Sequence, residues 1–408
     1  MNNYDAIVVG ARCGGSTTAM LLARQGHRVL LVDRATFPSD TLSTNVIHAR
    51  GVALLDKWGL LDRLVATGCP PMTHYCFDFG PVVIDGTTLP VDGHTVGYAP
   101  RRIILDQLLL DGAREAGVEV REAFNVDDLL IEDGVVTGIV GHSGADDPVD
   151  LRARIVIGAD GKNSHVARLA GATTYHEKPK LQYAYYTYFR DLPTDGMRAY
   201  IRPDRGFGVM PSNDGLTLIV VGWPYAEAAA YKADVEGNFL ATLEMVPEFA
   251  ERVRGATRVE PFLGGAVPHF FRTPYGPGWA LVGDAGVTRD PITAQGISSA
   301  FADAERCSTA VDAWIRGAAT YDDAMGAWHR ERDAVSLPVY EFTAQLAALE
   351  PPPQELQQLL GAIQGNQAAM DQFVSVNAGT LSPEVFFSPE NIGALLGSAE
   401  MPAEAVSA

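Results

Sequence analysis

A glycine-rich loop near the N-terminus is the first segment whose residue types and spacing point to chemistry. Residues 10–15 read GARCGG, follow the apolar stretch AIVV, and precede apolar side chains at helical spacing. A strand, a glycine loop and a helix in this order predict a dinucleotide pyrophosphate at the N-terminus of the helix. Gly10 and Gly15 stand at the first and third glycine positions of GxGxxG, and Arg12 replaces the second. Arg12 either contacts the pyrophosphate or points outward.

Two acidic residues extend this pattern. Asp33 ends the apolar stretch RVLLVD, 23 residues after Gly10, where a carboxylate would accept hydrogen bonds from the adenosine ribose. Asp284 follows the apolar residues 279–282 in a loop of small residues, so its carboxylate can accept hydrogen bonds from an extended polyol. A helix that begins near Gly296 would direct unsatisfied N–H groups and partial positive charge toward this loop. The alternative reading is a turn with an Asp cap.

Composition excludes several classes of protein. The 408 residues are 47% hydrophobic and 20% charged, so the chain can bury a large core and is expected to form more than one domain. A net charge of −19 argues against nucleic acid and anionic membrane surfaces as partners. The four cysteines form no CxxC pair, which argues against a metal site or a disulfide framework. We find no apolar run of about 20 residues and no signal peptide, so we expect no membrane span and a cytoplasmic location.

The elements that must position these residues follow from periodicity. The strands at residues 5–10 and 28–33 flank the helix Thr17–Gln25, which is a βαβ unit with parallel strands and predicts helices on both faces of the sheet. Further helices are expected at His48–Ala66, Arg102–Gly117 and Ile297–Trp314. Residues 181–223 alternate as strands and are rich in aromatic side chains. We expect a domain built from several separated segments, with a sheet domain inserted into it.

Two further motifs carry a resemblance to a known family. Residues 155–164 read IVIGADGKNS with Arg168 shortly after, and residues 281–285 read LVGDA. The second of these is followed by Pro291, Gln295–Gly296 and Asp303–Ala304, and Arg102 heads a helix. Together with the glycine loop, these motifs resemble the FAD-dependent monooxygenase superfamily typified by aromatic hydroxylases, with geranylgeranyl reductases and flavin-dependent halogenases as relatives. The motifs span about three quarters of the chain in the order of that family.

The resemblance implies an α/β fold with a Rossmann-like FAD-binding domain, an inserted mixed or antiparallel sheet domain for the substrate, and a helical C-terminal tail. The expected FAD-binding domain comprises residues 1–72, 99–175 and 270–335, the substrate domain residues 73–98 and 176–269, and the helical region residues 336–408. The residues expected to bind FAD are Gly10, Arg12, Cys13, Gly14, Gly15, Asp33, Arg34, Arg102, Asp160, Gly161, Gly283, Asp284, Gly296 and Ile297.

The resemblance also implies a reaction. NAD(P)H would reduce FAD, oxygen would add at C4a of the flavin, and the hydroperoxide would hydroxylate or epoxidise a small aromatic or polycyclic substrate. Because no second nucleotide fingerprint occurs, NAD(P)H would bind only transiently. The residues expected at the reactive face are His48, Pro291, Thr293, Gln295 and Gly296, and His269 is a further histidine of interest. The expected substrate wall is Tyr183, Tyr185, Phe189, Phe207 and Met210, although a tyrosine stripe is also typical of packing.

Departures from the family pattern keep alternatives open. Val287, Ala294 and Ser298 replace the usual histidine, glycine and asparagine of the third motif. A halogenase would carry a lysine near its channel and a WxWxIP segment, but residues 206–211 read GFGVMP and no lysine lies between Lys57 and Lys162. A reductase of prenyl double bonds shares the fold, and a non-enzymatic flavin carrier is the alternative outside enzymology. The sequence is compatible with a monomer or a homodimer.

Overall fold

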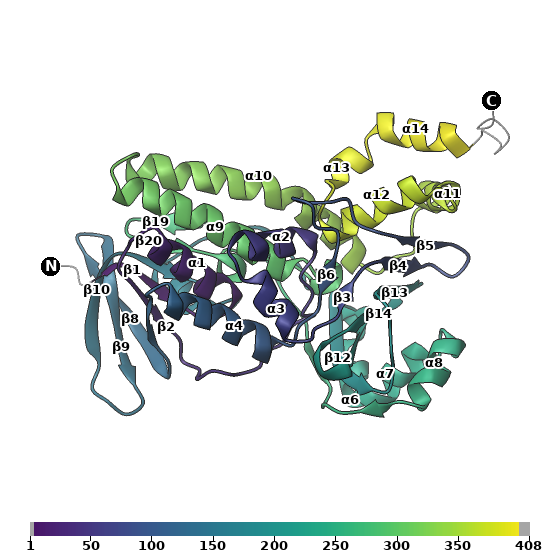
Figure 1. Ribbon diagram of the computed structural model, residues 1–408, viewed down its shortest axis with the longest axis horizontal. Coiled ribbons are helices and arrows are strands. Elements are labelled where there is room, and N and C mark those ends of the chain that lie inside the picture. Colours follow the sequence, from purple (N-terminus) through teal and green to yellow (C-terminus); the bar gives the residue numbers. More distant parts are fainter. Residues whose placement is uncertain (1–3, 400–408) are drawn as a thin grey trace.

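The computed structural model describes residues 4–399, in which two large sheets lie side by side (Figure 1). The first sheet lies on the left of Figure 1 and the second on the right. Helix α10 (Tyr321–Ala347) runs along the top of the first sheet toward the second. The C-terminal helices cover the second sheet from above.

The first sheet brings the ends of its parallel strands to one edge. Its strand order is β19-β20-β10-β1-β2-β7, with bounds Tyr275–Gly276, Trp279–Leu281, Val149–Gly158, Tyr4–Val9, Val29–Val32 and Glu119–Arg121. β1 pairs in parallel with β10 and β2, and β10 pairs in parallel with β20. The carboxyl ends of β1, β10 and β20 therefore share one edge, where ligands of such sheets bind. We call the loops 10–15, 159–164 and 283–296, which follow these strands, the motif edge.

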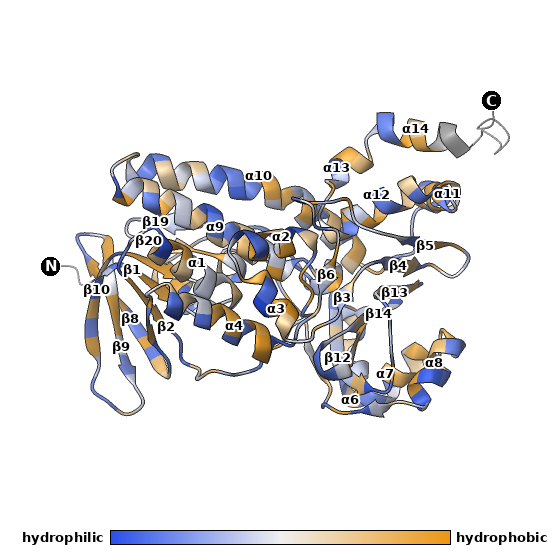
Figure 2. Ribbon diagram, viewed as in Figure 1, coloured by the Kyte–Doolittle hydropathy of each residue, from blue (hydrophilic) through white to orange (hydrophobic). Residues whose placement is uncertain are grey.

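The two faces of the first sheet are covered differently. Its strands are mostly apolar (Figure 2), and one face packs against α1 (Cys13–Arg24), α4 (Arg102–Glu115) and α9 (Gly296–Ile315). The other face is buried by β8 (Phe124–Glu132) and β9 (Val135–Ser143), with the short helix α5 (His165–Leu169). The expectation of helices on both faces is corrected here. The long strand β10 continues into an antiparallel ladder with β9, which also pairs with β8. This ladder covers the face on which a second layer of helices is expected.

The second sheet is largely antiparallel. Its order is β16-β12-β15-β14-β13-β4-β5, with bounds Thr257–Arg258, Gln182–Arg190, Thr217–Pro224, Arg205–Pro211, Met197–Arg202, Tyr75–Asp78 and Val83–Gly86, and β17 (Leu263–Gly265) also pairs with β12. One face packs against α6 (Ala228–Ala233), α7 (Val235–Leu243) and α8 (Pro247–Arg254). The other face packs against α10, α11 (Gln354–Ile363), α12 (Gln367–Ala378), α13 (Pro383–Phe386) and α14 (Pro389–Ala399).

A small sheet joins the two halves of the molecule. β18 (His269–Arg272) pairs with β11 (Thr174–Lys178) on one side and with β21 (Val287–Thr288) on the other. β11 leads into the second sheet and β18 leads back from it, so the two crossings of the chain run side by side. β3 (Pro71–Met72) and β6 (Gly97–Tyr98) form a separate pair.

Two expected boundaries differ from those observed. The single helix expected at His48–Ala66 is divided into α2 (Ala49–Lys57) and α3 (Leu61–Ala66). Gly59 adopts φ +69° between them, a conformation that ends a helix and that glycine adopts without steric cost. The boundary expected between residues 335 and 336 falls inside the continuous helix α10. Residues 400–408 of the expected helical region lie outside the described residues.

Between residues 4 and 399, no helix combines the length and the apolar character needed to cross a bilayer.

Candidate cofactor and substrate site

The glycine loop of the motif edge brings β1, α1 and the loop after β10 into close contact. Gly10 has φ +103°, and a Cβ at this position would lie 2.6 Å from the carbonyl oxygen of Ala159. A Cβ on Gly15 would lie 1.6 Å from the carbonyl oxygen of Gly10. Both positions therefore require glycine, the first for the turn and the third for helix packing. The 12-residue helix α1 has no side-chain cap and no acidic residue in its first turn, so its N-terminal N–H groups can bind an anion.

Arg12 is neither free nor turned outward. Its guanidinium donates to Asp106 Oδ2 at 2.6 Å, and it also donates to the Ser39 carbonyl and hydroxyl and to the Asp40 carbonyl. Arg102 donates to both oxygens of the same carboxylate at 2.9–3.0 Å. Two guanidinium groups therefore share one fully buried carboxylate, which leaves one positive charge in excess beside the N-terminus of α1. Such an excess favours a bound anion.

Cys13 and Gly14 lie at the same helix end. The Cys13 thiol donates to Asp106 Oδ1 at 3.4 Å, and burial raises its pKa, so the thiol stays protonated. A Cβ on Gly14 would lie 3.6 Å from the Val282 side chain, which precedes the third motif. The first and third motifs are therefore in contact.

Two predicted acidic ligands already hold the backbone of the site. Asp33 accepts from the amides of Ala11 and Ala35 at 2.6 and 2.8 Å, which fastens the glycine loop to the end of β2. Asp160 accepts from the Ser164 hydroxyl and the His165 amide, which fixes the start of α5. Both Asp33 oxygens and Asp160 Oδ1 keep lone-pair capacity for a ligand, whereas Asp160 Oδ2 also accepts from the Val166 amide. Of their neighbours, Arg34 is exposed and Gly161 adopts φ +79°.

Asp284 differs from these residues because no hydrogen bond to its carboxylate is found among the described residues. Its side chain reaches solvent, yet the surrounding protein desolvates it enough to raise its pKa, an effect that Arg289, Arg102 and Lys162 oppose. Arg289 lies in the third motif, Arg102 in α4 and Lys162 in the second motif. The preceding Gly283 has φ +63°, and its amide donates to Asp303 Oδ2 at 2.9 Å, which ties the loop to α9.

The N-terminus of α9 completes the motif edge. This 20-residue helix begins at Gly296 with no side-chain cap and no acidic residue in its first turn. Gly296 is exposed, and nothing lies within 4 Å of a Cβ built on it, whereas the adjoining Ile297 is buried. Two uncapped helix ends, an excess cation and an unpaired carboxylate suit a long cofactor that carries phosphates, a polyol and an electron-accepting ring.

Comparison with known proteins decides between nucleotide cofactors. The family model described as "FAD binding domain" matches residues 3–343. The chain belongs to this FAD binding domain family. It is an FAD-dependent oxidoreductase, and the resemblance inferred from the three motifs is confirmed.

Individual relatives of this FAD-binding chain differ in the reactions that their names give. It is 29% identical over 316 residues to digeranylgeranylglycerophospholipid reductase 2 of Methanococcoides burtonii, which covers 74% of this chain and 72% of the relative. It is 30% identical over 316 residues to 6-methylpretetramide 4-monooxygenase of Streptomyces rimosus, with 74% and 73% covered. The myxobacterial chondrochloren halogenase CndH is similar in structure, with a TM-score of 0.78 at 24% identity over 97% and 96% of the two chains. The expected α/β fold with mixed sheets and C-terminal helices is thereby confirmed.

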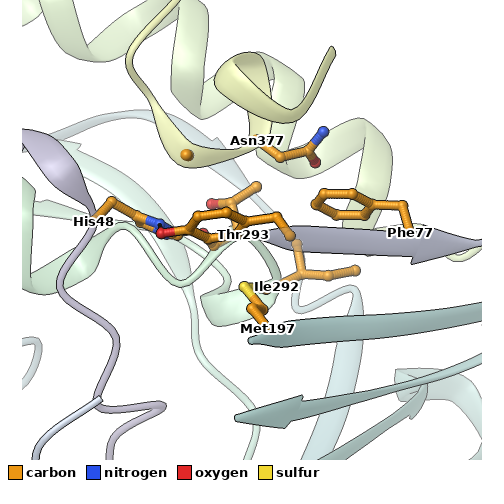
Figure 3. A pocket seen from close by; sticks show the side chains of 8 residues that line it. His48, Phe77, Met197, Ile292, Thr293 and Asn377 are labelled. Atoms are coloured by element: carbon orange, nitrogen blue, oxygen red, sulfur yellow. Dashed lines mark hydrogen bonds between the residues drawn. The ribbon is translucent and has the colours of Figure 1, made fainter. Parts of the chain in front are cut away.

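Beside the third motif lies a small cavity, which we call the His48 cavity (Figure 3). It is small, with a volume of about 10 Å³, which is room for about one water molecule. It is lined by His48, Tyr75, Phe77, Met197, Ile292, Thr293, Asn377 and Ala378. The turn Pro291–Thr293, the second sheet and the end of α12 all contribute to this wall. The FAD-binding motif and the C-terminal helices therefore meet at one place.

His48 is buried and held in one tautomer. Its Nε2–H donates to the Thr293 carbonyl at 3.0 Å, so its Nδ1 must accept from the Tyr75 hydroxyl at 3.3 Å. Burial lowers the pKa of His48 to about 4, which keeps the ring neutral near pH 7. The neutral ring links the turn Pro291–Thr293 to the second sheet.

Gln295 holds the same turn from the other side. Its Nε2 donates to the Asn377 carbonyl at 2.8 Å, and a Cβ on Gly379 would lie 2.6 Å from Gln295 Oε1. Pro291 is half-buried at the start of the turn. The C-terminal helices are therefore fastened directly to the third motif.

The expected substrate wall requires a correction. Tyr183, Tyr185, Phe189 and Phe207 lie on the face of the second sheet that packs toward α6, α7 and α8. Only Met210 of the expected set lies on the opposite face, which also carries Tyr186 and Tyr188. Alternate strand residues do point to opposite faces of the sheet, but alternation does not show which face borders a cavity.

His269 lies outside the His48 cavity. Its side chain and that of Asp290 are fully buried, with Nε2 and Oδ2 3.9 Å apart, and both His269 nitrogens are unpaired among the described residues. Asp290 instead accepts from the Ile292 amide and the Gln182 side chain, and burial raises its pKa. These contacts position the turn that follows Asp290 and give His269 no contact with the cavity.

Proposed function

We propose that the protein is a monooxygenase that consumes NAD(P)H and oxygen and hydroxylates or epoxidises a small aromatic or polycyclic compound. Bound FAD would supply the hydride acceptance and the oxygen activation. The chain itself would bind and orient FAD at the motif edge, position the substrate against the wall of the His48 cavity and exclude water from the space between them.

The His48 cavity is the observation that carries this proposal. The side chains of Phe77, Met197 and Ile292 give it apolar walls, and the turn that faces the cofactor forms one side of it (Figure 3). Typical ligand pockets enclose about 300–1,000 Å³, whereas this cavity has a volume of about 10 Å³. The apolar side chains and the adjoining turn therefore support the proposal, and the size of the cavity does not choose between a monooxygenase and the prenyl reductase alternative.

The polar groups of the cavity are neutral. Because Tyr75 donates its proton to His48, its phenolic oxygen remains an acceptor for a hydroxyl or amine of the substrate. His48 in turn donates its Nε2–H to the Thr293 carbonyl, which fixes the direction of the Tyr75 hydroxyl. The arrangement suits an uncharged aromatic compound with a hydrogen-bond donor. None of the eight lining residues is a lysine, which gives no support to a halogenase.

The test is oxygen-dependent turnover of the FAD-loaded protein. We expect phenols and arylamines to stimulate NADH or NADPH oxidation in air, with one atom of ¹⁸O₂ incorporated into the product. Consumption of an isoprenoid substrate without oxygen would establish the reductase instead, and halide-dependent product would establish a halogenase.

A variant that fills the cavity separates substrate binding from cofactor binding. Ala378→Phe places a ring into the wall contributed by α12, while the motif edge is untouched. We expect unchanged FAD content and at least a tenfold loss of substrate-stimulated oxidation. Ala348→Phe, at the end of α10 and outside the cavity wall, is the matched control. Full turnover by Ala378→Phe would contradict the assignment of the cavity.

A further inference from the structure

Arg289 is a cation at the motif edge that the sequence motifs did not indicate. It follows β21 and precedes the turn Pro291–Thr293. Its guanidinium donates to the Ser299 hydroxyl, and no other hydrogen bond from this group is found among residues 4–399. Since a guanidinium carries five N–H donors, most of them remain available to a ligand.

The position of this charge is defined by two neighbours. Ser299 lies in the first turn of α9, the uncapped helix end that contributes partial positive charge. Asp284 is close enough that Arg289 is the largest of the charges that oppose the rise in its pKa. Arg289 therefore lies between the carboxylate expected to hold the ribityl chain and the helix end expected to face the flavin ring.

Arg289 stays charged in this environment. Burial lowers its pKa to about 10, against the opposing influence of Asp284, so the group is protonated at neutral pH. A half-buried guanidinium with a single neutral partner is costly to hold unless an anionic acceptor completes its bonding. Reduced flavin carries negative charge at N1 and the neighbouring carbonyl, whereas oxidised flavin is neutral.

We propose that Arg289 contacts the pyrimidine end of bound FAD and stabilises its reduced, anionic form, which raises the reduction potential of the cofactor. This role of Arg289 requires FAD binding but not the monooxygenase reaction, so the two proposals can fail separately. The helix end and the guanidinium would act on the same charge, because both present N–H groups fixed in advance.

The test compares the midpoint potential of FAD in the wild-type protein and in Arg289→Gln. We expect the variant to bind reduced FAD at least tenfold more weakly relative to oxidised FAD. For a two-electron couple this ratio corresponds to a fall of about 30 mV. Arg254→Gln removes an equal charge from the exposed helix α8 and should leave the potential unchanged. Equal potentials in wild type and Arg289→Gln would overturn the proposal, whatever reaction the enzyme catalyses.

Arg289→Lys keeps the proposal testable if the glutamine variant does not fold. A lysine retains the charge and, being partly buried, loses its proton at lower pH than arginine does. The potential of this variant should match wild type at pH 6 and fall below it as the pH rises to 9. A constant difference from wild type across this range would also overturn the proposal, because it would show that the charge of the side chain does not matter.

Discussion

The motif edge is built from ionised groups, whereas the His48 cavity next to it is built from neutral ones. At the motif edge, Arg12 and Arg102 share Asp106, and two helix ends add partial positive charge. In the cavity, burial keeps His48 uncharged, and the remaining wall is amide, hydroxyl and apolar. The two regions meet at the turn Pro291–Thr293, where His48 donates to the Thr293 carbonyl, and at Gln295, which donates to the Asn377 carbonyl.

This difference indicates how the two ligands would be recognised. A cofactor with a pyrophosphate can be held by excess positive charge, because each ion that is buried gains a partner. An uncharged substrate in a dry cavity is selected by shape and by one or two hydrogen bonds. Charge changes should therefore affect the motif edge strongly and the cavity weakly, and the variants below test this expectation.

The largest effect is expected from Asp106→Asn. This change leaves the buried Arg102 and the partly exposed Arg12 without their shared carboxylate, and breaking a buried pair such as Arg102–Asp106 costs about 3–5 kcal/mol. Urea unfolding of the FAD-free protein measures the loss. Asp111→Asn on the same helix alters a half-exposed pair with Arg114 and should cost less than about 1 kcal/mol. Equal losses in the two variants would show that the motif edge does not depend on its buried charge.

His48→Gln tests the neutral side of the comparison through pH. The pKa of His48 falls from 6.5 to about 4 on folding, so the unfolded chain binds the proton first as the pH decreases. The stability that neutral His48 contributes is therefore present above pH 6.5 and is lost as the pH falls toward 4. At about 1.36 kcal/mol per unit, wild type should lose up to about 3 kcal/mol relative to His48→Gln between pH 7 and pH 4. Parallel stability curves would mean that folding does not lower the pKa of His48, because the folded and unfolded chains would then bind its proton equally well.

Asp284→Ala should weaken FAD binding without unfolding the chain. Its carboxylate has no hydrogen-bond partner among the described residues, so the fold loses no bond, whereas a charge-assisted bond to the cofactor is worth about 1.5–3 kcal/mol. We expect roughly 10- to 100-fold weaker binding in a fluorescence titration with FAD. Asp147→Ala, in an exposed loop, is the control. Unchanged affinity would remove Asp284 from the cofactor site.

The same contrast explains how much could be predicted from sequence. Gly10 and Gly15 can be recognised from the sequence because the physical demands on them, a turn and a close approach, act within a few residues of a strand end. The polyol contact of Asp284 stays a prediction. The end of the helix at Gly59 and the antiparallel ladder on the second face cannot be recognised in this way, because both depend on tertiary packing. The cavity was hardest to predict, since Asn377 lies more than 300 residues from His48 and no local pattern links them.

Arg12 and Arg289 illustrate a related difficulty. The sequence leaves the direction of Arg12 open. In the structure its guanidinium donates to Asp106, a buried carboxylate of α4 that belongs to none of the sequence motifs. Arg289 stands among motif residues but matches no motif position, so only its placement beside Asp284 and Ser299 makes it a candidate. Which group neutralises an arginine depends on contacts between distant segments of the folded chain. The spacing of residues in the sequence does not show these contacts.

The smallest effect is expected from Tyr185→Phe, and its size decides between the two faces of the second sheet. Tyr185 belongs to the expected substrate wall but packs toward Trp223 on the face covered by α6, α7 and α8. Removal of the Tyr185 hydroxyl should change the free energy of unfolding by less than about 1 kcal/mol and leave the KM for substrate unchanged. Phe77→Leu, on the cavity wall, should instead alter KM several-fold at constant FAD affinity. If KM changes for Tyr185→Phe and not for Phe77→Leu, the substrate lies on the face covered by α6, α7 and α8. Only on that face could the Tyr185 hydroxyl contact a bound ligand.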